Sequence, residues 1–179
     1  MKKDVKDIRD KKFIIYMVVM FITCFVLSPV VMLAGDSPTS RKSLEGIKAI
    51  SVLMEKLPPD LIKTGLNMDI IRLEVELRLR LAGLTVGAST EVPFLYVNIN
   101  GFKQSEHPLY VVNVAVELCQ DVYLARSPET WITGVTTWSI EDVAIMGEKT
   151  LYEEVRRKTN DLVDRFINAY LSVNPKGEK

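Results

Sequence analysis

The sequence has few of the residues that carry enzyme chemistry. One histidine and two cysteines among 179 residues exclude a disulfide scaffold and a multi-histidine metal site. The chain also lacks a Gly-x-Ser-x-Gly nucleophile elbow and a glycine-rich phosphate loop. Basic and acidic residues number 23 each, so the formal charge is zero and nucleic-acid binding is not expected. We therefore expect no enzyme, with no catalytic residues, no cofactor and no metal.

A charge-free apolar run lies close to the N-terminus. Residues 1–12 carry six basic and three acidic side chains, a net charge of +3, and Phe13–Ala34 contains no charge at all. These 22 residues would span about 33 Å as a helix, enough to cross a bilayer. A basic flank keeps the N-terminus in the cytoplasm. Residues 1–35 therefore predict a hydrophobic membrane-anchoring helix, with the rest of the chain outside the cytoplasmic membrane.

A cleaved signal peptide is the alternative interpretation of this run. Phe13–Leu27 could be its apolar stretch, with cleavage near Ala34 or Gly35. The position two residues before each candidate bond is occupied by Met32 or Leu33, which are not small. Cleavage would leave a periplasmic or exported protein. A lipoprotein anchor on Cys24 is rejected, because no small residue directly precedes that cysteine.

The remainder of the chain has the composition of one small domain. Residues 36–43 are rich in Ser and Thr and predict a short polar linker, and residues 44–176 predict an exported domain. Beyond residue 12 the chain carries 17 basic and 20 acidic side chains, so binding to anionic lipid or nucleic acid by charge is not favoured. Cys119 is expected to be a small core residue.

Two segments have helical patterns. Alternating leucines and charges over residues 70–82 fit a strand by period, but Leu, Glu and Arg favour a helix, which we predict over Met68–Ala82. Asn67 is its expected N-cap and Gly83 its expected end. The second helix is expected to start with a capping box, Thr150 to Glu153, and to end at Asn174-Pro175. The side chains expected to form the buried face of the first helix are Leu66, Ile70, Leu73, Leu77, Leu81 and Leu84.

Period-two alternation predicts the strands. The expected strand segments are Gly46–Leu57, a short one from Leu84, Phe94–Phe102, Tyr110–Leu124 and Trp131–Ile140. A mostly antiparallel sheet with both helices on one face would bury the apolar sides of all these elements together. The sequence therefore predicts an α+β two-layer domain with four to five strands.

Four stretches resemble a widespread group of small exported bacterial proteins of unassigned function. They are Val75–Arg80, Leu95–Asn100, Thr137-Trp138, and Phe166–Leu171 continuing through Asn174-Pro175-Lys176. The resemblance covers most of Leu44–Lys176. In that group the closing motif more often has Asp at the position of Ala169, a change that leaves the helix intact.

The order of elements is also similar to the amino-terminal domain of the translocation protein TolB. Domains of curli-channel proteins and of lipoprotein activators of cell-wall synthases are related to it. This resemblance is one of topology, so it says more about fold than about function. It implies a domain that docks other envelope proteins and does not catalyse a reaction.

Aromatic residues on the predicted strands are the most informative candidates for a binding surface. Trp131 and Trp138 are seven residues apart, so on a regular strand they point to opposite faces. We expect one of them to lie in the core and the other to be exposed. Trp131, Trp138 and Tyr96 are therefore the candidate partner surface. His107 and the pair Glu117 and Asp121 are weaker candidates, more readily explained as solvated side chains.

The leading functional hypothesis is a non-catalytic, membrane-tethered or exported envelope module that binds another envelope protein. The alternative is a small-ligand or lipid-binding domain, which requires an enclosed apolar cavity. An enzyme would require titratable groups that converge in a cleft. The sequence does not identify the partner or the oligomeric state.

Overall fold

The computed structural model describes residues 35–87 and 93–175. The predicted membrane segment, Phe13–Ala34, lies outside the described residues. Within the described ranges, no helix combines the length and apolar character that a membrane crossing requires.

The described elements follow one another as the sequence patterns broadly indicate. In chain order they are α2 (Pro38–Arg41), the 3-10 helix η1 (Lys42–Leu44), β1 (Ala49–Met54), α3 (Pro59–Ile62), α4 (Met68–Leu81), β2 (Thr85–Val86), β3 (Phe94–Lys103), β4 (Leu109–Leu124), β5 (Ser127–Gly147) and α5 (Leu151–Val173).

The five strands form one mixed sheet in the order β2-β1-β3-β4-β5. β1 is parallel to both of its neighbours, β2 and β3, whereas β3, β4 and β5 form an antiparallel meander. The parallel β1–β2 pair is possible because α4 carries the chain back between these strands. Most of the paired length is antiparallel, because β4 and β5 are the longest strands.

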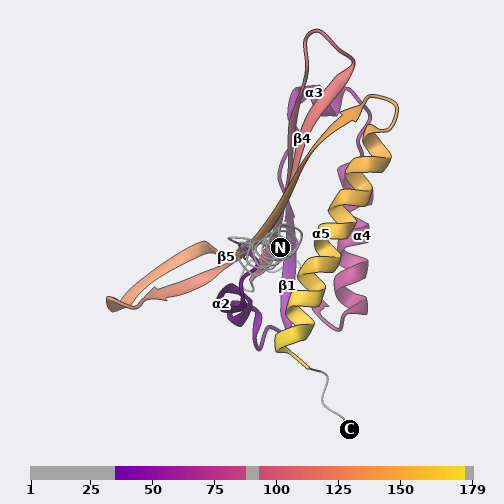
Figure 1. The fold of residues 1–179 in the computed structure, drawn as a ribbon. Coiled ribbons are helices and arrows are strands. Elements are labelled where there is room, and N and C mark those ends of the chain that lie inside the picture. Colours follow the sequence, from indigo (N-terminus) through magenta and orange to yellow (C-terminus); the bar gives the residue numbers. More distant parts are fainter. Residues whose placement is uncertain (1–34, 88–92, 176–179) are drawn as a thin grey trace, which may run out of the picture. The chain divides into compact units, whose positions relative to one another are not determined.

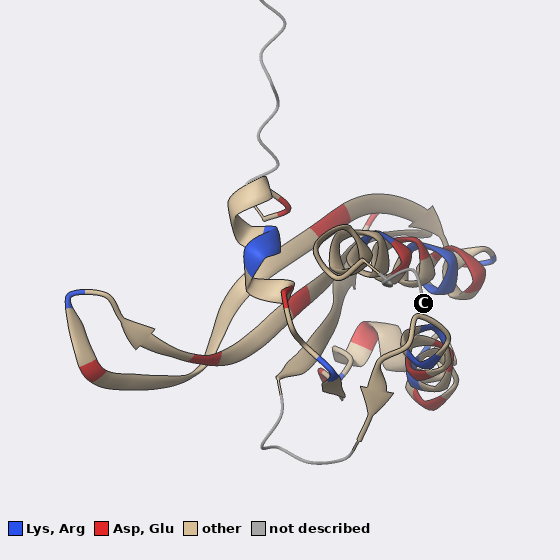
Figure 2. Cartoon of the chain, turned by 90° about the horizontal axis from the view of Figure 1, so that it is seen from below, with Lys and Arg blue, Asp and Glu red and all other residues tan. Residues whose placement is uncertain are grey.

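Both long helices cover the same face of the sheet (Figure 1). α4 contacts β1 and β2, and α5 contacts β4 and β5. Viewed along their axes, the two helices lie side by side and carry interleaved charges of both signs (Figure 2). The predicted α+β two-layer domain is therefore confirmed.

The centre of the core is an aromatic contact between the sheet and α5. Trp138 of β5 and Phe166 of α5 meet edge to face, with ring centroids 5.3 Å apart and an interplanar angle of 68°. Aromatic pairs favour this geometry because the positive edge of one ring meets the negative face of the other. The two side chains have exposed fractions of 1% and 0%, so α5 cannot leave the sheet without exposing both.

The C-terminal end of α5 holds the first residues of the domain in place. The Tyr170 hydroxyl donates to the backbone oxygen of Ile47 at 3.1 Å. Asn174 accepts from the Gly46 N–H at 2.7 Å and donates to the Leu44 oxygen at 2.9 Å. Residues 44–47, which precede β1, are therefore fixed by residues about 125 positions later in the chain.

Helix α4 has the predicted bounds and caps, but the predicted buried face is wrong. Asn67 accepts hydrogen bonds from the N–H groups of Asp69 and Ile70, and the chain leaves the helix at Gly83 with a φ of +99°. The residues of α4 that point into the core are Ile71, Val75 and Leu79. The residues that face solvent are Ile70, Leu73, Leu77 and Leu81. Leu66 and Leu84, at the two ends of the predicted face, are buried as expected.

Ion pairs between the two helices explain this rotation of α4. Glu74 accepts hydrogen bonds from Arg156 of α5, and Arg78 donates to Asp164 of α5 at 2.7 Å. Glu74 and Arg78, four residues apart on α4, therefore each contact α5. Because α4 has apolar residues on two sides, its own pattern did not determine which side is buried.

The start of α5 also differs from the prediction. Thr150 makes no side-chain capping bond. Its hydroxyl donates instead to the oxygen of Gly147 at 3.3 Å and its N–H donates to the same oxygen at 3.1 Å. The expected capping box with Glu153 is absent because the Thr150 backbone has φ −105° and ψ −4°, not the extended conformation of an N-cap residue.

Two segments contain more helix or strand than the sequence predicted. Residues 36–43, expected as a polar linker, form α2 and the beginning of η1, with Ser37 and Ser40 making a reciprocal capping box. β5 begins at Ser127 and ends at Gly147, so it extends beyond the predicted Trp131–Ile140 at both ends.

A comparison of substitutions at Leu77 and Leu79 tests the orientation of α4. Leu79 is fully buried and Leu77 is 55% exposed. We expect Leu79→Ala to lower the free energy of unfolding by about 2–5 kcal/mol through the cavity it leaves, and Leu77→Ala to change it by about 0.5 kcal/mol or less. Urea unfolding of the full chain in detergent, at a dilution at which it is monomeric, followed by circular dichroism, measures both. Equal losses in the two variants would contradict the observed orientation.

Candidate interaction arm

The hairpin of β4 and β5 extends beyond the rest of the sheet. β3 begins at Phe94, which pairs with Cys119 of β4, so within the described residues the part of β4 after Cys119 pairs only with β5. We call residues 120–135 the arm; they comprise two strand segments and the turn at residues 125–126. The arm leaves the sheet at an angle and projects from it (Figure 1). A two-stranded hairpin is marginally stable by itself, so it must be supported at its base.

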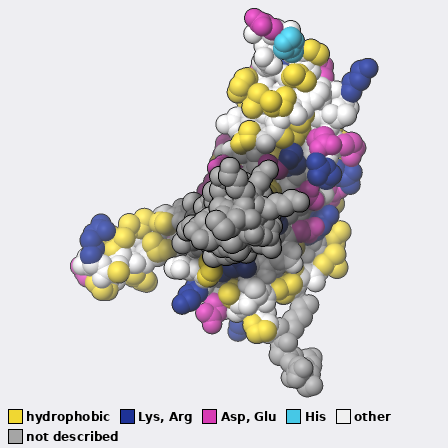
Figure 3. Space-filling view, in the orientation of Figure 1, with side chains coloured by type: hydrophobic (Ala, Val, Ile, Leu, Met, Phe, Trp, Pro, Cys, Tyr) yellow, Lys and Arg dark blue, Asp and Glu magenta, His cyan; other side chains and the backbone are white. Residues whose placement is uncertain are grey.

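Apolar side chains occupy both faces of the arm. Tyr123 is paired across the strands with Trp131, and Val122 with Ile132. Successive residues of a strand point to opposite faces, so each pair lies on its own face. Tyr123, Trp131 and Ile132 are 69%, 58% and 39% exposed. Hydrophobic side chains accordingly gather along the projecting arm in Figure 3.

Hydrogen bonds at the base direct the arm away from the sheet. The Gln120 side chain donates to the Ser43 oxygen of η1 at 3.2 Å and to the Thr137 hydroxyl at 2.8 Å. Asp121 accepts from the N–H of Gly134, which has a φ of +65°. The strand register shifts between Leu118 and Cys119 and again after Gln120. Such bulges bend and twist a hairpin, which accounts for the change of direction at this point.

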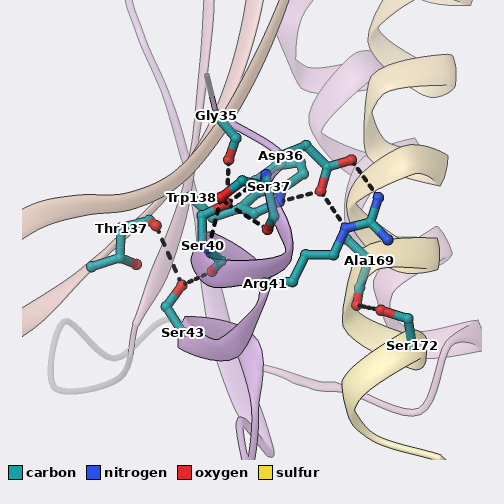
Figure 4. A network of polar contacts seen from close by, with 10 residues as sticks. All are labelled: Gly35, Asp36, Ser37, Ser40, Arg41, Ser43, Thr137, Trp138, Ala169 and Ser172. Atoms are coloured by element: carbon teal, nitrogen blue, oxygen red, sulfur yellow. Dashed lines mark hydrogen bonds and ion pairs between the residues drawn. The ribbon is translucent and has the colours of Figure 1, made fainter. Parts of the chain in front are cut away.

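A polar network beside the base fixes the beginning of the described chain (Figure 4). The Asp36 carboxylate accepts hydrogen bonds from Arg41 Nε at 2.6 Å and from Arg41 Nη2 at 2.8 Å. It also accepts from the indole Nε1 of Trp138 at 2.9 Å. The Ser40 hydroxyl donates to the Gly35 oxygen at 2.8 Å, and the Ser139 N–H donates to the same oxygen at 3.4 Å. Residues 35–41 are therefore fixed to β5 close to the arm.

Arg41 keeps Asp36 ionised. Its guanidinium lowers the pKa of the Asp36 carboxyl below the ordinary 3.8, burial opposes this effect, and the hydrogen bond from Trp138 lowers the pKa further. The Asp36 side chain is 10% exposed, so these hydrogen bonds are largely shielded from water. A charge-assisted bond in such surroundings is stronger than one between neutral groups.

The predicted surface residues do not lie together. Trp131 is exposed on the arm, whereas Trp138 is buried against Phe166 and offers no surface to a partner. Tyr96 is half-buried on β3, and its hydroxyl donates to Glu55, which raises the pKa of Tyr96 to about 12. The expectation of one core and one exposed tryptophan agrees with the structure, with Trp131 as the exposed residue.

The weaker chemical candidates are explained by local contacts. His107 is exposed in the turn between β3 and β4. Glu117 accepts from the Thr136 hydroxyl at 2.8 Å, and Asp121 holds Gly134 as described. Burial raises the pKa of the Cys119 thiol, and a protonated thiol is a poor nucleophile. Within residues 35–87 and 93–175, no three His, Cys, Asp or Glu side chains are grouped as metal ligands.

Two hollows lie on the surface of the described residues. A hollow of about 380 Å³ lies over α4 and α5 and is lined by Arg, Glu, Asp and Asn side chains, among them Arg78 and Arg157. A second, of about 320 Å³, lies beside Ser43 and Gln120 at the base of the arm. Both are open to solvent, so neither is the enclosed apolar cavity that a lipid-binding domain requires.

Sequence reasoning found Trp131 but missed Tyr123 and Ile132 as its companions. The available indication was the difference in length between two predicted strands. Tyr110–Leu124 is longer than its partner Phe94–Phe102, so part of it had to continue beyond the sheet. That excess is the segment of β4 that forms the arm.

No protein-family model matches the chain, and no curated protein matches it. Among solved structures, a minor lipoprotein from Acinetobacter baumannii is similar at 13% identity, with 72% of this chain and 94% of that chain covered and a TM-score of 0.40. The rare lipoprotein B from Shewanella oneidensis has 17% identity, coverages of 70% and 96%, and a TM-score of 0.38. The PelC dodecamer from Paraburkholderia phytofirmans has 14% identity, coverages of 70% and 86%, and a TM-score of 0.38. Likenesses this weak carry no conclusion about function, and the TolB-like topology and the closing motif stay predictions.

Removing the Asp36 carboxylate tests the network beside the arm. We expect Asp36→Ala to lower the free energy of unfolding at neutral pH by about 1–3 kcal/mol, because the donors on Trp138 and Arg41 lose their acceptor. The folded-state pKa of Asp36 lies below 3.8, so this stabilisation is complete above that value and is lost as the pH falls through the folded-state pKa. The difference between the two proteins should therefore shrink in acid.

Urea unfolding at neutral pH and at a pH well below 3.8 measures this difference. Glu106→Ala, in the exposed turn before β4, is the matched control and should change stability little at either pH. A loss in Asp36→Ala that is the same at both pH values would show that the carboxylate charge is not responsible.

Proposed function

We propose that this protein is a non-catalytic, membrane-anchored module of the bacterial cell envelope that binds another envelope protein through the arm. The observation that carries the proposal is the Tyr123–Trp131 pair, which is exposed to solvent on a hairpin to which no third strand of the described residues is paired. Tyrosine and tryptophan are enriched among the residues that dominate binding energy at protein interfaces. A protein gains nothing in stability from exposing them on a projecting hairpin.

The arm offers backbone groups as well as side chains. Within the described residues, no further strand pairs with the segments 120–124 and 127–135 on their outer edges. A free edge presents N–H and C=O groups to which an extended segment of a partner can add as a new strand. The aromatic side chains on the faces would then supply specificity. This combination suits a polypeptide partner better than a small molecule.

The membrane anchor is supported by the N-terminal sequence. The net charge of +3 over residues 1–12 and the charge-free Phe13–Ala34 match a helix that crosses the cytoplasmic membrane with its N-terminus inside. Only Gly35, whose oxygen accepts from Ser40 and Ser139, separates this run from Asp36. The anchored domain then stays at the membrane surface, where an envelope partner is within reach.

Photocrosslinking from the arm tests this proposal. A photoreactive amino acid at Trp131 in the full chain, expressed in bacterial membranes, should give one discrete protein adduct. The same amino acid at Phe102, which is equally exposed at 57% against 58% but lies on β3 away from the arm, should not give that adduct. Mass spectrometry of the adduct identifies the partner and shows whether it is a protein or a lipid.

The double variant Tyr123→Ser with Trp131→Ser provides the quantitative measurement. Binding to the partner found by crosslinking should weaken at least about 30-fold, because two aromatic anchors are lost. Stability should change little, since both side chains are exposed. Adducts with lipid alone, or partner binding that is unchanged in the double variant, would refute the proposed role of the arm.

A further inference from the structure

Helix α4 carries a second apolar side that the fold of a single chain does not cover. Four of its large side chains face solvent, with exposed fractions of 44%, 71%, 55% and 75% for Ile70, Leu73, Leu77 and Leu81. We call these four residues the α4 ridge. The core side of α4 is equally apolar and fully buried at Ile71, Val75 and Leu79. A helix that is apolar on opposite sides is normally covered on both.

Contacts with α5 leave the ridge free and fixed in orientation. Glu74 is bound by Arg156 and by the Asn160 amide, and Arg78 is bound by Asp164. These contacts lie along one flank of α4 and prevent the helix from rotating its leucines inward. The ridge is therefore a constant feature of the folded domain.

The spacing of the ridge fits a second copy of the same helix. Successive ridge residues are three, four and four positions apart along the chain. In the opposite direction the spacing is four, four and three, which is nearly the same pattern. An antiparallel pair of α4 helices about a two-fold axis therefore places Leu73 beside Leu77 of the second copy and Ile70 beside its Leu81. Both halves of such an interface use the same residues, as a closed dimer requires.

Charges beside the ridge agree with this antiparallel arrangement. At 100° per residue, Asp69 and Arg80 lie on the same flank of α4, one near each end of the ridge. Antiparallel packing brings Asp69 of each copy beside Arg80 of the other, so two opposite-charge contacts form by symmetry. Between them Glu76 is already paired with Arg72 and Arg80 of its own chain. A parallel pair about a two-fold axis would instead place this flank of the two copies on opposite sides of the pair, so Asp69 and Arg80 would not meet.

We infer that the α4 ridge is a homodimer interface in which the α4 helices of two copies pack antiparallel. The interface is independent of the arm, which lies on β4 and β5. A helix pair of this length is a small interface, and confinement of both copies to one membrane raises their effective concentration.

Disulfide crosslinking determines the direction of packing. In full chains carrying Cys24→Ser and reconstituted in vesicles, the double variant Leu73→Cys with Leu77→Cys should form a covalent dimer on mild oxidation. Each single variant should crosslink at least about tenfold less, because its cysteine and the same cysteine of the second copy are about 7 Å apart along the helix axis. Efficient crosslinking in the single variants, or none in the double variant, would overturn the antiparallel interface.

A charge in the ridge tests whether these leucines hold the dimer together. The change Leu73→Glu keeps a strong helix former and should weaken dimerisation of the full chain in detergent at least about 100-fold, because two buried leucines are lost per dimer. Its control is Ile145→Glu on β5, which has a matching exposed fraction of 69% against 71%; this variant should dimerise as the unmodified chain does. Sedimentation equilibrium measures all three proteins, and circular dichroism checks their folding. An unmodified chain that stays monomeric, or a Leu73→Glu variant that dimerises normally, would refute the inference whatever binds the arm.

Discussion

The contact between Trp138 and its two neighbours connects the parts of this domain that sequence keeps far apart. The indole packs on Phe166 of α5 and donates its single hydrogen bond to Asp36 at the start of the described chain. One side chain of β5 therefore contacts α5 and the segment 36–41 at once. Because the indole is buried, its N–H needs an acceptor, and Asp36 provides one that Arg41 keeps ionised. The base of the arm depends on this arrangement, since η1 follows directly after Arg41 and accepts the hydrogen bond from Gln120.

The apolar side chains of the core and the exposed apolar side chains belong to different parts of the domain. Its sheet and two helices bury one continuous set of apolar side chains, while the arm and the α4 ridge present apolar side chains to solvent. The arm can do so because bulges and Gly134 bend it away from the layer that the helices cover. The ridge can do so because ion pairs with α5 determine which side of α4 is turned inward. In both places polar contacts, and not burial, decide where an apolar surface points.

The class of fold could be predicted from sequence because periodicity and composition agreed over most elements. The alternation of residues in β3 and β4 allowed only a strand. The apolar residues of α5 allowed only one buried face. The predictions went wrong where two solutions had similar local support. Leucines on two sides of α4 allowed either face to be buried, and the choice depended on Arg156 and Asp164, some 80 residues away. The Thr150–Glu153 pattern was locally valid, but Thr150 was recruited by the turn at Gly147.

The candidate site was predictable only in part, for a similar reason. Exposure of one tryptophan follows from alternation, but which one is buried depends on Phe166 and Asp36, and neither is near β5 in sequence. The arm itself arises from a mismatch in strand length, a property of paired strands and not of any single one. Its bend depends on the conformation of Gly134, which gives no periodic pattern.

The hydrogen bonds between α5 and residues 44–47 have a consequence for the order of events during synthesis. Residues 44–47 receive their hydrogen-bond partners from Tyr170 and Asn174, which leave the ribosome more than 120 residues later. A nascent chain that ends before α5 contains residues 44–47 but not the side chains to which they are hydrogen-bonded. These contacts therefore form only after α5 has been synthesised, and a shorter nascent chain has to fold without them.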